Sequence, residues 1–253
     1  MIQLKKRLGQ HFLHDKNIIN KILKHVKPEK NQHFLEIGPG NGILSKPLYN
    51  KIKSLILIEK DKKLIPILDQ VFYNQKNINI YNKDILKYNF ENISKKIRII
   101  GNLPYNISTE ILFKILNISE KIIDVHFMLQ KEVVDRIIAK PNSKIYGRLS
   151  VMCQVYFNIE KLFEISPNVF YPKPKVQSAY IKMIPYQTRF HNNKHEKMFY
   201  DIVKTTFESR RKMIKSTLKD KMDLKILEKL NINPNQRPEK ISVDDFLNIS
   251  KAL

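Results

Sequence analysis

From residue 33 to residue 139, short apolar runs alternate with stretches whose apolar residues recur at helical spacing. The runs predict strands at 33–38, 54–59, 78–82, 97–100 and 124–129. Helices are predicted between them at about 43–51, 62–72, 109–116 and 132–139, and ahead of them at 15–26. Strictly alternating strands and helices imply a mostly parallel sheet with helices on both faces. The right-handedness of such connections favours a doubly wound, Rossmann-like α/β fold.

The pattern changes after Gly147. Residues 170–175 read FYPKPK and cannot form regular structure, because each proline fixes φ and removes a backbone donor. Residues 176–184 alternate weakly, as an outer strand does, and a polar stretch follows before the apolar spacing becomes helical up to the C-terminus. We therefore expect a Rossmann-like domain over residues 1–185 and a small all-helical domain over residues 186–253.

The formal net charge is +22, from 46 Lys and Arg against 24 Asp and Glu. A chain this basic is expected to bind polyanions, because each phosphate that it neutralises releases condensed counterions. Codon bias in an AT-rich genome could raise the lysine count by itself, since only eight of the basic residues are arginines and Ile and Asn abound. The basic residues gather at 1–30 and 204–221, however, which favours a nucleic-acid surface over uniform drift.

A single cysteine, Cys153, excludes an internal disulfide and fits a reducing compartment. No apolar run approaches the ~18 residues that a membrane span needs. Charges occupy the N-terminal positions where a signal peptide would be apolar. We therefore expect a cytoplasmic protein without a membrane segment, and nothing in the sequence suggests more than a monomer.

Three of the six glycines lie together in EIGPGNG, at Gly38, Gly40 and Gly42, directly after a predicted strand. Such a turn gives the backbone positive φ angles or a close approach to a ligand at the start of the next helix. The dinucleotide pattern would want glycine at Ile43, so the G-x-G-x-G spacing differs from it. The spacing resembles the S-adenosylmethionine loop of class I methyltransferases, and a purely structural tight turn is the alternative.

Two acids end the next two predicted strands. Glu59 ends the strand in LILIE, where a carboxylate can accept hydrogen bonds from both ribose hydroxyls of a nucleoside cofactor. Asp84 ends the following strand, in IYNKD. In class I methyltransferases an acid there meets the adenine amino group of the cofactor, whereas enzymes that use NAD have no fixed counterpart. Asp84 therefore favours a methyl donor, and an ordinary strand-end carboxylate is the alternative for Glu59.

Asn102-Leu103-Pro104-Tyr105 follows the fourth predicted strand, at the edge where ligands bind in open sheets. It resembles the [DNS]-P-P-[FY] motif of methyltransferases that act on planar amino groups. The lone pair of such a nitrogen is delocalised into the ring, and two acceptors on its two hydrogens free that lone pair. The Asn102 side-chain oxygen and the Leu103 carbonyl can be these acceptors. Pro104 stiffens the turn, and Tyr105 offers a flat face to an extruded base.

Methyl transfer from a sulfonium needs little general-base catalysis, so positioning and electrostatics should supply most of the rate. The sequence agrees, because no catalytic triad or pair of carboxylates is evident in it. The nearest set of metal-ligand types is His11, His14 and Asp15, which lacks a convincing fourth ligand. We therefore expect no metal.

Taken together, these features resemble the bacterial small-subunit ribosomal RNA adenine dimethyltransferases over nearly the whole chain. Besides the two central motifs, the resemblance rests on RLGQHFL at 7–13, FMLQKEV at 127–133, YGRLSV at 146–151 and FYPKPKVQS at 170–178. It implies that two methyl groups pass from S-adenosylmethionine to N6 of each of two adjacent adenines near the 3′ end of 16S rRNA. It also implies that the small ribosomal subunit is the partner and that the protein acts in subunit biogenesis.

The resemblance also implies roles for individual residues by motif position. Cofactor contacts are implied for His11, Leu13, Gly38, Gly40, Glu59, Asp84 and Asn102. Catalytic roles are implied for Asn102, Leu103, Pro104, Tyr105 and Phe170. Phe170 would close over the target base opposite Tyr105, and packing before a proline-rich turn is its alternative. RNA phosphates would be held by Arg148, Arg210, Arg211, Lys212 and Lys215, the last four of which could instead form a solvated helix face.

Two other functions stay open. A large-subunit ribosomal RNA adenine methylase of the macrolide-resistance type would share the fold and the tetrapeptide chemistry. YGRLSV, FYPKPKVQS and the helical domain favour the small-subunit enzyme over it. A non-catalytic RNA-binding factor that kept the fold would be expected to lose Asn102, Glu59 or Asp84, and all three are present.

Overall fold

The computed structural model describes residues 10–253. Arg7, Leu8 and Gly9, which begin the RLGQHFL segment, lie outside the described residues. The chain divides into two compact units. The first holds the residues up to Val134 and Ile159–Pro185, and the second holds Asp135–Asn158 and Tyr186–Leu253. In residues 10–253, no helix is long and apolar enough to cross a membrane.

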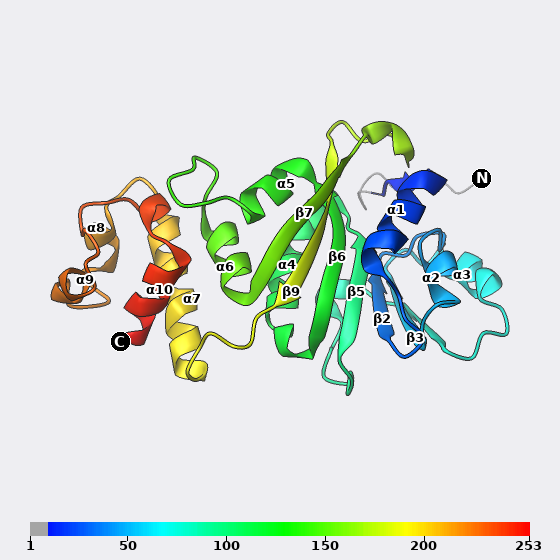
Figure 1. The fold of residues 1–253 in the computed structure, drawn as a ribbon, viewed down its shortest axis with the longest axis horizontal. Helices are drawn as coiled ribbons and strands as arrows, with labels where there is room; N and C mark the ends of the chain where they lie inside the picture. Colours follow the sequence, from blue (N-terminus) through cyan, green and yellow to red (C-terminus); the bar gives the residue numbers. More distant parts are fainter. Residues whose placement is uncertain (1–9) are drawn as a thin grey trace. The chain divides into compact units, whose positions relative to one another are not determined.

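In the described part of the chain, the first unit is built on a seven-stranded sheet (Figure 1). Its strands are β2 (His33–Ile37), β3 (Ser54–Glu59), β4 (Ile78–Asn82), β5 (Ile97–Asn102), β6 (Ile122–Gln130), β7 (Phe157–Ile165) and β9 (Ser178–Pro185). Their order across the sheet is β4-β3-β2-β5-β6-β9-β7, parallel from β4 to β6, with β9 antiparallel to β6. The five predicted strands and the mostly parallel sheet are confirmed. β7 was not predicted, because FNIEKLFEI mixes charged and apolar residues without clean alternation.

Helices follow the parallel strands: α2 (Ser45–Tyr49) after β2, α3 (Ile65–Val71) after β3, α4 (Ser108–Leu116) after β5 and α5 (Lys131–Ile137) after β6. α2 and α3 are shorter than predicted. Proline fits the first turn of a helix better than its interior. Pro47 and Pro66 therefore place the two helix starts near Ser45 and Ile65.

α1 (Lys16–Val26) packs one apolar face into the core of the first unit. Asp15 caps it by accepting from two backbone amides of the first turn, at 2.8 and 2.9 Å. Ile22 and Val26 on its apolar face share a core cluster with Phe34 of β2. Full burial of side chains of this size stabilises the fold by about 1.5–3 kcal/mol each. These contacts hold α1, and the segment just before it, against the sheet.

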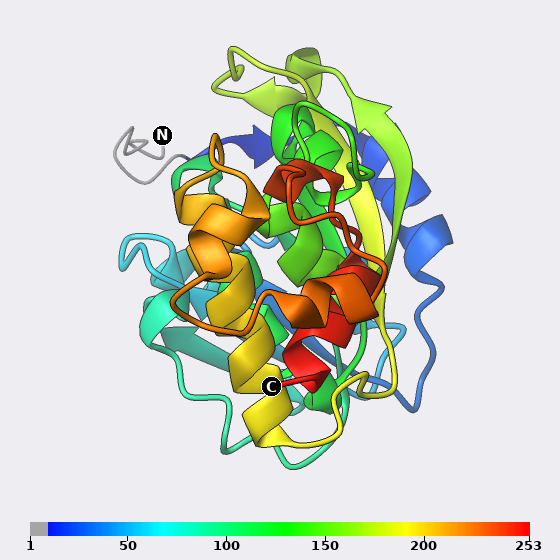
Figure 2. The same cartoon turned by 90° about the vertical axis from the view of Figure 1, so that its left-hand side faces the viewer.

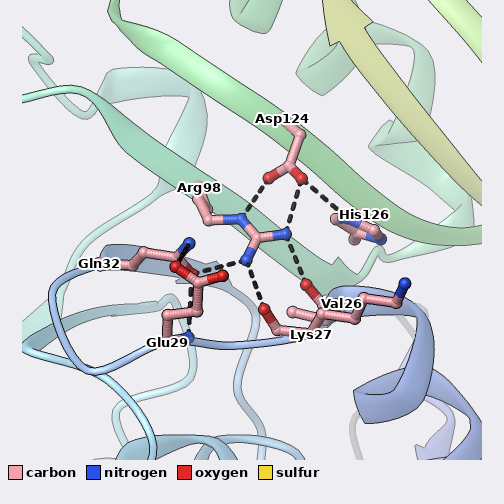
Figure 3. A network of polar contacts seen from close by, with 7 residues as sticks. All are labelled: Val26, Lys27, Glu29, Gln32, Arg98, Asp124 and His126. Carbon is pink, nitrogen blue, oxygen red and sulfur yellow. Dashed lines mark hydrogen bonds and ion pairs between the residues drawn. The ribbon is translucent and has the colours of Figure 1, made fainter.

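Arg98 of β5 joins the end of α1 to the middle of the sheet (Figure 3). Its guanidinium donates to both carboxylate oxygens of Asp124 on β6, each at 2.7 Å. It also donates to the carbonyls of Val26 and Lys27, at 2.6 and 3.3 Å, and to the Gln32 side chain at 2.7 Å. The last carbonyls of a helix have no partner within it, so Arg98 satisfies two of them while Asp124 balances its charge.

His126 of β6 extends this network. Its Nε2 lies 3.2 Å from Oδ2 of Asp124, and Nε2 carries the proton because a carboxylate only accepts. Its Nδ1 is buried without a hydrogen-bond partner among the described residues. Burial lowers the pKa of His126, and the hydrogen bond to Asp124 offsets this only in part. Burial alone would raise the pKa of Asp124, but the hydrogen bonds and charges of His126 and Arg98 outweigh it and lower that pKa to about 2.

The second unit contains α6 (Arg148–Tyr156), α7 (Asn193–Glu208), α8 (Ile214–Leu218), α9 (Lys225–Lys229) and α10 (Val243–Lys251). α7 and α10 lie side by side, as the yellow and red helices of Figure 2 show. The C-terminal segment is helical, as predicted, but residues 135–158 belong to the same unit. The buried Tyr146 donates its hydroxyl to the Ile241 carbonyl at 3.0 Å, which ties that segment to the C-terminal helices. The predicted boundary between residues 185 and 186 misses this earlier segment.

Candidate active site

The candidate site lies where the order of the parallel strands in the sheet reverses. β2 and β5 are neighbours in the sheet, although β3 and β4 come between them in the chain. Open α/β sheets bind ligands at the carboxyl ends of the strands at such a switch point. A cavity at this edge is lined by residues at or just after the ends of β2, β3, β4 and β5, among them Gly38, Glu59, Asp84 and Asn102.

The glycine-rich turn runs along the cavity with three positive φ angles. Gly38, Gly40 and Gly42 have φ values of +66°, +62° and +78°, a region that disfavours side chains. A Cβ added to Gly40 would lie 2.7 Å from Cε1 of Phe12, so this position also lacks space for a side chain. The prediction that this turn needs glycine is confirmed, and its backbone lines the cavity.

Glu59 ends β3 in the cavity wall and is 6% exposed. Its Oε2 accepts from the Gly40 amide at 3.1 Å and its Oε1 from the Asp61 amide at 2.7 Å. Burial raises the pKa of Glu59, and these two backbone hydrogen bonds oppose the rise. A carboxylate has about four acceptor sites, so both oxygens keep capacity for the two hydroxyls of a ribose.

Asp84 follows β4 and caps the short 3₁₀ turn after it. Its carboxylate accepts from the Leu86 amide at 3.0 Å and pairs with Nζ of Lys60 at 2.7 Å. Burial would raise the pKa of Asp84, but the hydrogen bonds from Lys60 and Leu86 and the nearby lysine charges outweigh it and lower that pKa. The ionised carboxylate lies in the cavity wall, where it can accept from an adenine amino group.

Glu36 of β2 is a buried acid of the same wall for which the sequence predicted no role. It is 2% exposed and accepts a hydrogen bond from the Ser45 hydroxyl at 2.5 Å. Burial raises the pKa of Glu36 to about 7, the hydrogen bond from Ser45 opposes the rise, and the charge of Glu59 adds to it. Its signal in the sequence is the acid directly before IGPGNG, at the end of a run that otherwise reads as a buried strand.

Asn102 ends β5, and its side-chain amide has a defined orientation. Its Nδ2 donates to the backbone carbonyl of His11 at 2.7 Å. A carbonyl only accepts, so the amide nitrogen must face His11 and Oδ1 must face the other way. Oδ1 is then the atom that can accept from a substrate amino group. The next residue, Leu103, is held by a hydrogen bond from its amide to the Met128 carbonyl at 3.1 Å.

Tyr105 lines the cavity and is held by two contacts. Its ring stacks on the ring of His11, with centroids 5.3 Å apart and planes inclined by 29°. Its hydroxyl shares a hydrogen bond with that of Ser178, at the start of β9, at 2.5 Å. Burial raises the pKa of Tyr105 in spite of that hydrogen bond. The phenol therefore stays neutral, and the two contacts give the ring a defined position.

Residues 10–13 line the same cavity. The Gln10 side-chain amide donates to the Asp61 carboxylate at 3.1 Å, beside the backbone that binds Glu59. Nδ1 of His11 lies 2.6 Å from the carbonyl of Pro172 and carries the proton, because a carbonyl only accepts. The segment predicted to contact the cofactor thus lies at the site. Apart from the residues GQH within RLGQHFL, nothing in the sequence indicates either contact.

The structure places Phe170 away from the cavity. The strands β1 (Phe12–Leu13) and β8 (Phe170–Tyr171) pair antiparallel, with Leu13 opposite Phe170. Phe170 is 2% exposed and belongs to the core cluster around α1. Of the described residues, those that line the cavity do not include it. The packing interpretation of Phe170 matches this position, and closure over a base does not.

The residues predicted to bind RNA lie in the second unit, in differing surroundings. Arg148 donates to the Tyr200 hydroxyl at 2.6 Å, with its guanidinium 5.0 Å from that ring's centroid. Arg210 pairs with Glu239 at 3.1 Å and donates to the Lys144 carbonyl, so it has structural contacts within the unit. Arg210 is exposed, as are Arg211, Lys212 and Lys215. Their part in RNA binding stays a prediction.

Two of the three residues considered as metal ligands have other partners. Asp15 caps α1, and His11 is bound to the Pro172 carbonyl. In the part of the chain that the structure describes, no group of three His, Cys, Asp or Glu residues is placed to hold a metal ion.

Comparison with known proteins gives a consistent result over the full chain. A family model described as ribosomal RNA adenine dimethylase matches residues 1–253. The ribosomal RNA small subunit methyltransferase A of Methylobacillus flagellatus is 44% identical over 249 residues, which cover 98% of this chain and 97% of that protein. The protein of the same name from a Marinomonas species is 41% identical over 252 residues, which cover 98% of this chain and 95% of that one.

Solved structures with the same fold include a dimethyladenosine transferase from Plasmodium falciparum. It has a TM-score of 0.83 and 24% identity, and the match covers 94% of this chain and 96% of that one. The 23S rRNA methyltransferase ErmE has a TM-score of 0.74 and 22% identity, with 96% and 99% covered. At these identities the likeness shows the fold alone, and it confirms the predicted Rossmann-like class I methyltransferase fold with appended helices.

Proposed function

This chain belongs to the ribosomal RNA adenine dimethylase family, and we propose that it methylates N6 of two adjacent adenines near the 3′ end of 16S rRNA. The enzyme is an S-adenosylmethionine-dependent rRNA adenine dimethyltransferase. The observation that carries the proposal is the orientation of the Asn102 amide, whose Nδ2 is bound by His11 so that Oδ1 is the acceptor for a substrate. Two curated relatives at 44% and 41% identity are named as small-subunit methyltransferases, which supports the small subunit as target.

The cavity residues fit S-adenosylmethionine. Glu59 keeps acceptor capacity for the ribose hydroxyls, and Asp84 can accept from the adenine amino group. Gly38 and Gly40 have positive φ angles and no side chain, and both line the cavity, so backbone there can lie close to a ligand. When bound, S-adenosylmethionine would supply a methyl group on a sulfonium, whose neutral thioether is a good leaving group once the methyl is transferred.

The tetrapeptide residues orient the target amino group. Oδ1 of Asn102 and the carbonyl of Leu103 each accept one N–H, which draws electron density back onto the nitrogen and aims its lone pair at the methyl group. Tyr105 stacks on the extruded base, and its ring is already held by His11 and Ser178. Most of the rate enhancement then comes from groups positioned before the substrate binds.

The partner is the small ribosomal subunit, and the enzyme acts as a cytoplasmic monomer during its biogenesis. Arg211, Lys212 and Lys215 of the second unit are exposed and can contact RNA phosphates. A large-subunit target is the second candidate. The ErmE structure does not favour it, because at 22% identity that likeness concerns the fold alone.

Ribosomes from a strain that lacks this protein test the proposal. Primer extension and mass spectrometry would locate the dimethyladenines that disappear. We expect two adjacent adenines near the 3′ end of the small-subunit RNA to lose their methyl groups, and the loss to be reversed by the wild-type gene but not by Asn102→Ala. Loss of dimethyladenine from the large subunit instead would contradict the proposed target.

A further inference from the structure

We propose that Tyr171 forms a second base-stacking site, which holds the adenine next to the one that reacts. The inference rests on the proposed function, because it needs a target with two adjacent adenines. It assigns a substrate contact to a residue of the FYPKPKVQS segment that had no predicted role.

The register of the β1–β8 pair decides which way Tyr171 faces. Residues directly opposite each other in an antiparallel pair have their side chains on the same face, and successive residues alternate. Phe170 and Leu13 form one such pair and are buried in the core. Tyr171 is opposite Phe12, whose ring lies against Gly40 of the glycine-rich turn. The side chain of Tyr171 is therefore on the face of the pair that Phe12 presents to the cavity.

Tyr171 lies beside the cavity and not inside it. It is 69% exposed, and it is not one of the described residues that line the cavity. The next residue, Pro172, holds His11 through its carbonyl at 2.6 Å, and His11 stacks on Tyr105. A chain of direct contacts thus connects the backbone next to Tyr171 with the ring on which the target base is proposed to stack.

The residues after Tyr171 suit a single RNA strand. Lys173 and Lys175 are exposed, and they alternate with prolines in the chain directly after Tyr171. Val176 is 44% exposed and adds apolar surface. Proteins that bind single strands combine an aromatic platform for the bases with cations for the phosphates. An exposed tyrosine followed by two lysines at the cavity rim has that composition.

The reaction explains why a second stacking site is useful. An adenine in the cavity has left its neighbours, so the adjacent adenine loses a stacking partner. Tyr171 can replace that partner, since an aromatic ring stacks on any base. While one adenine reacts on Tyr105, the other is held outside, and the two exchange places for the second round of methylation.

The test uses full-length enzyme and small subunits reconstituted with rRNA that carries a synthetic 3′ segment. One substrate has both adenines, and a second has an abasic nucleotide in place of one of them. The variants are Tyr171→Ala, Tyr171→Phe and, as matched control, Tyr73→Ala. Tyr73 is 75% exposed, lies in the connection before β4 and is not one of the described residues that line the cavity.

On the intact pair we expect Tyr171→Ala to lower kcat/KM roughly tenfold, the size of a lost base–aromatic stack. Tyr171→Phe and Tyr73→Ala should stay near wild type. On the abasic substrate the wild type should fall to the level of Tyr171→Ala, and the substitution should have no further effect. Cofactor affinity and Tm should not change, because the side chain is exposed.

Two results would overturn the inference while leaving the proposed function intact. One is wild-type activity of Tyr171→Ala on the intact pair. The other is an equal loss on both substrates, which would mean that Tyr171 contacts the reacting nucleotide or its backbone. If the wild type does not methylate small subunits at all, the proposed function fails and this inference fails with it.

Discussion

The side-chain amide of Asn102 donates to the backbone carbonyl of His11 at 2.7 Å, across 91 residues of sequence. This contact orients the Asn102 amide, because Nδ2 is the one side-chain atom that can donate to a carbonyl. It also joins the tetrapeptide to residues 10–13, which line the same cavity.

Asn102→Ala should abolish methyl transfer and spare most cofactor binding. The alanine removes the acceptor for the amino group, and losing a group of this kind lowers kcat by about 10²-fold or more. Asn102→Asp is the sharper comparison, because it keeps an acceptor but places a carboxylate against the His11 carbonyl. We expect it to weaken cofactor binding, measured by titration calorimetry, more than the alanine does. Wild-type turnover in Asn102→Ala would refute the assigned role.

Tyr105 and Ser178 should affect catalysis through the one hydrogen bond that joins them. A buried hydrogen bond contributes about 1 kcal/mol, so Tyr105→Phe and Ser178→Ala should each lower kcat by roughly fivefold. Since both remove the same contact, the double variant should be no slower than either single one. A double-mutant cycle from single-turnover rates checks this. Additive losses would show that Ser178 does not act through Tyr105.

Gly40→Ala should weaken cofactor binding and lower Tm. Its φ of +62° disfavours a side chain, and the new Cβ would lie 2.7 Å from Phe12. Adding Phe12→Ala should recover part of the loss, because it removes the clash but not the strained φ. Gly147→Ala is the control, since nothing lies within 4 Å of a Cβ there. Equal effects at Gly40 and Gly147 would contradict this explanation.

Glu36 should make the cofactor-free protein less stable as pH rises. Its pKa is about 7 in the folded state and 4.5 unfolded, so the folded state binds its proton more tightly. Stability is therefore full below pH 4.5 and falls as pH rises through 7. Glu36→Gln removes this dependence and keeps an acceptor for Ser45. It should be more stable than wild type by about 3 kcal/mol at pH 8 and little different at pH 4.5, measured by urea unfolding. The same difference at both pH values would argue against a buried, titrating Glu36.

RNA affinity should fall steeply with salt if the +22 charge is functional. Each phosphate contact releases counterions, so the slope of log K against log salt reports their number. The double variant Arg211→Ala, Lys212→Ala should flatten this slope. The comparison variant removes the exposed Lys51 and Lys53, which lie between α2 and β3. A flat response between low and physiological salt would favour codon bias as the origin of the charge.

The cavity edge was predictable because strand ends carry their own signals. Gly38, Glu59, Asp84 and Asn102 each end or follow an apolar run, and parallel strands bring such positions to one edge. The contacts that hold them were not predictable. Asn102 and His11, or Tyr105 and Ser178, lie far apart in sequence and meet through the packing of β1, β8 and β9.

Which of Phe170 and Tyr171 faces the core was not predictable from the sequence either. The two aromatics are adjacent, and a shift of one residue in the β1–β8 register would exchange their faces. Composition and motif position cannot determine that register. The same holds for residues 135–158, whose place in the second unit depends on Tyr146 reaching Ile241.

One assay identifies the RNA on which the tetrapeptide acts. Purified enzyme and labelled methyl donor are incubated side by side with unmethylated small subunits, stripped small-subunit RNA and large subunits. We expect label to enter the small-subunit RNA as N6,N6-dimethyladenosine at two adjacent positions near its 3′ end, and Asn102→Ala to transfer none. Label in the large subunit, or equal transfer by the Asn102→Ala enzyme, would contradict this expectation.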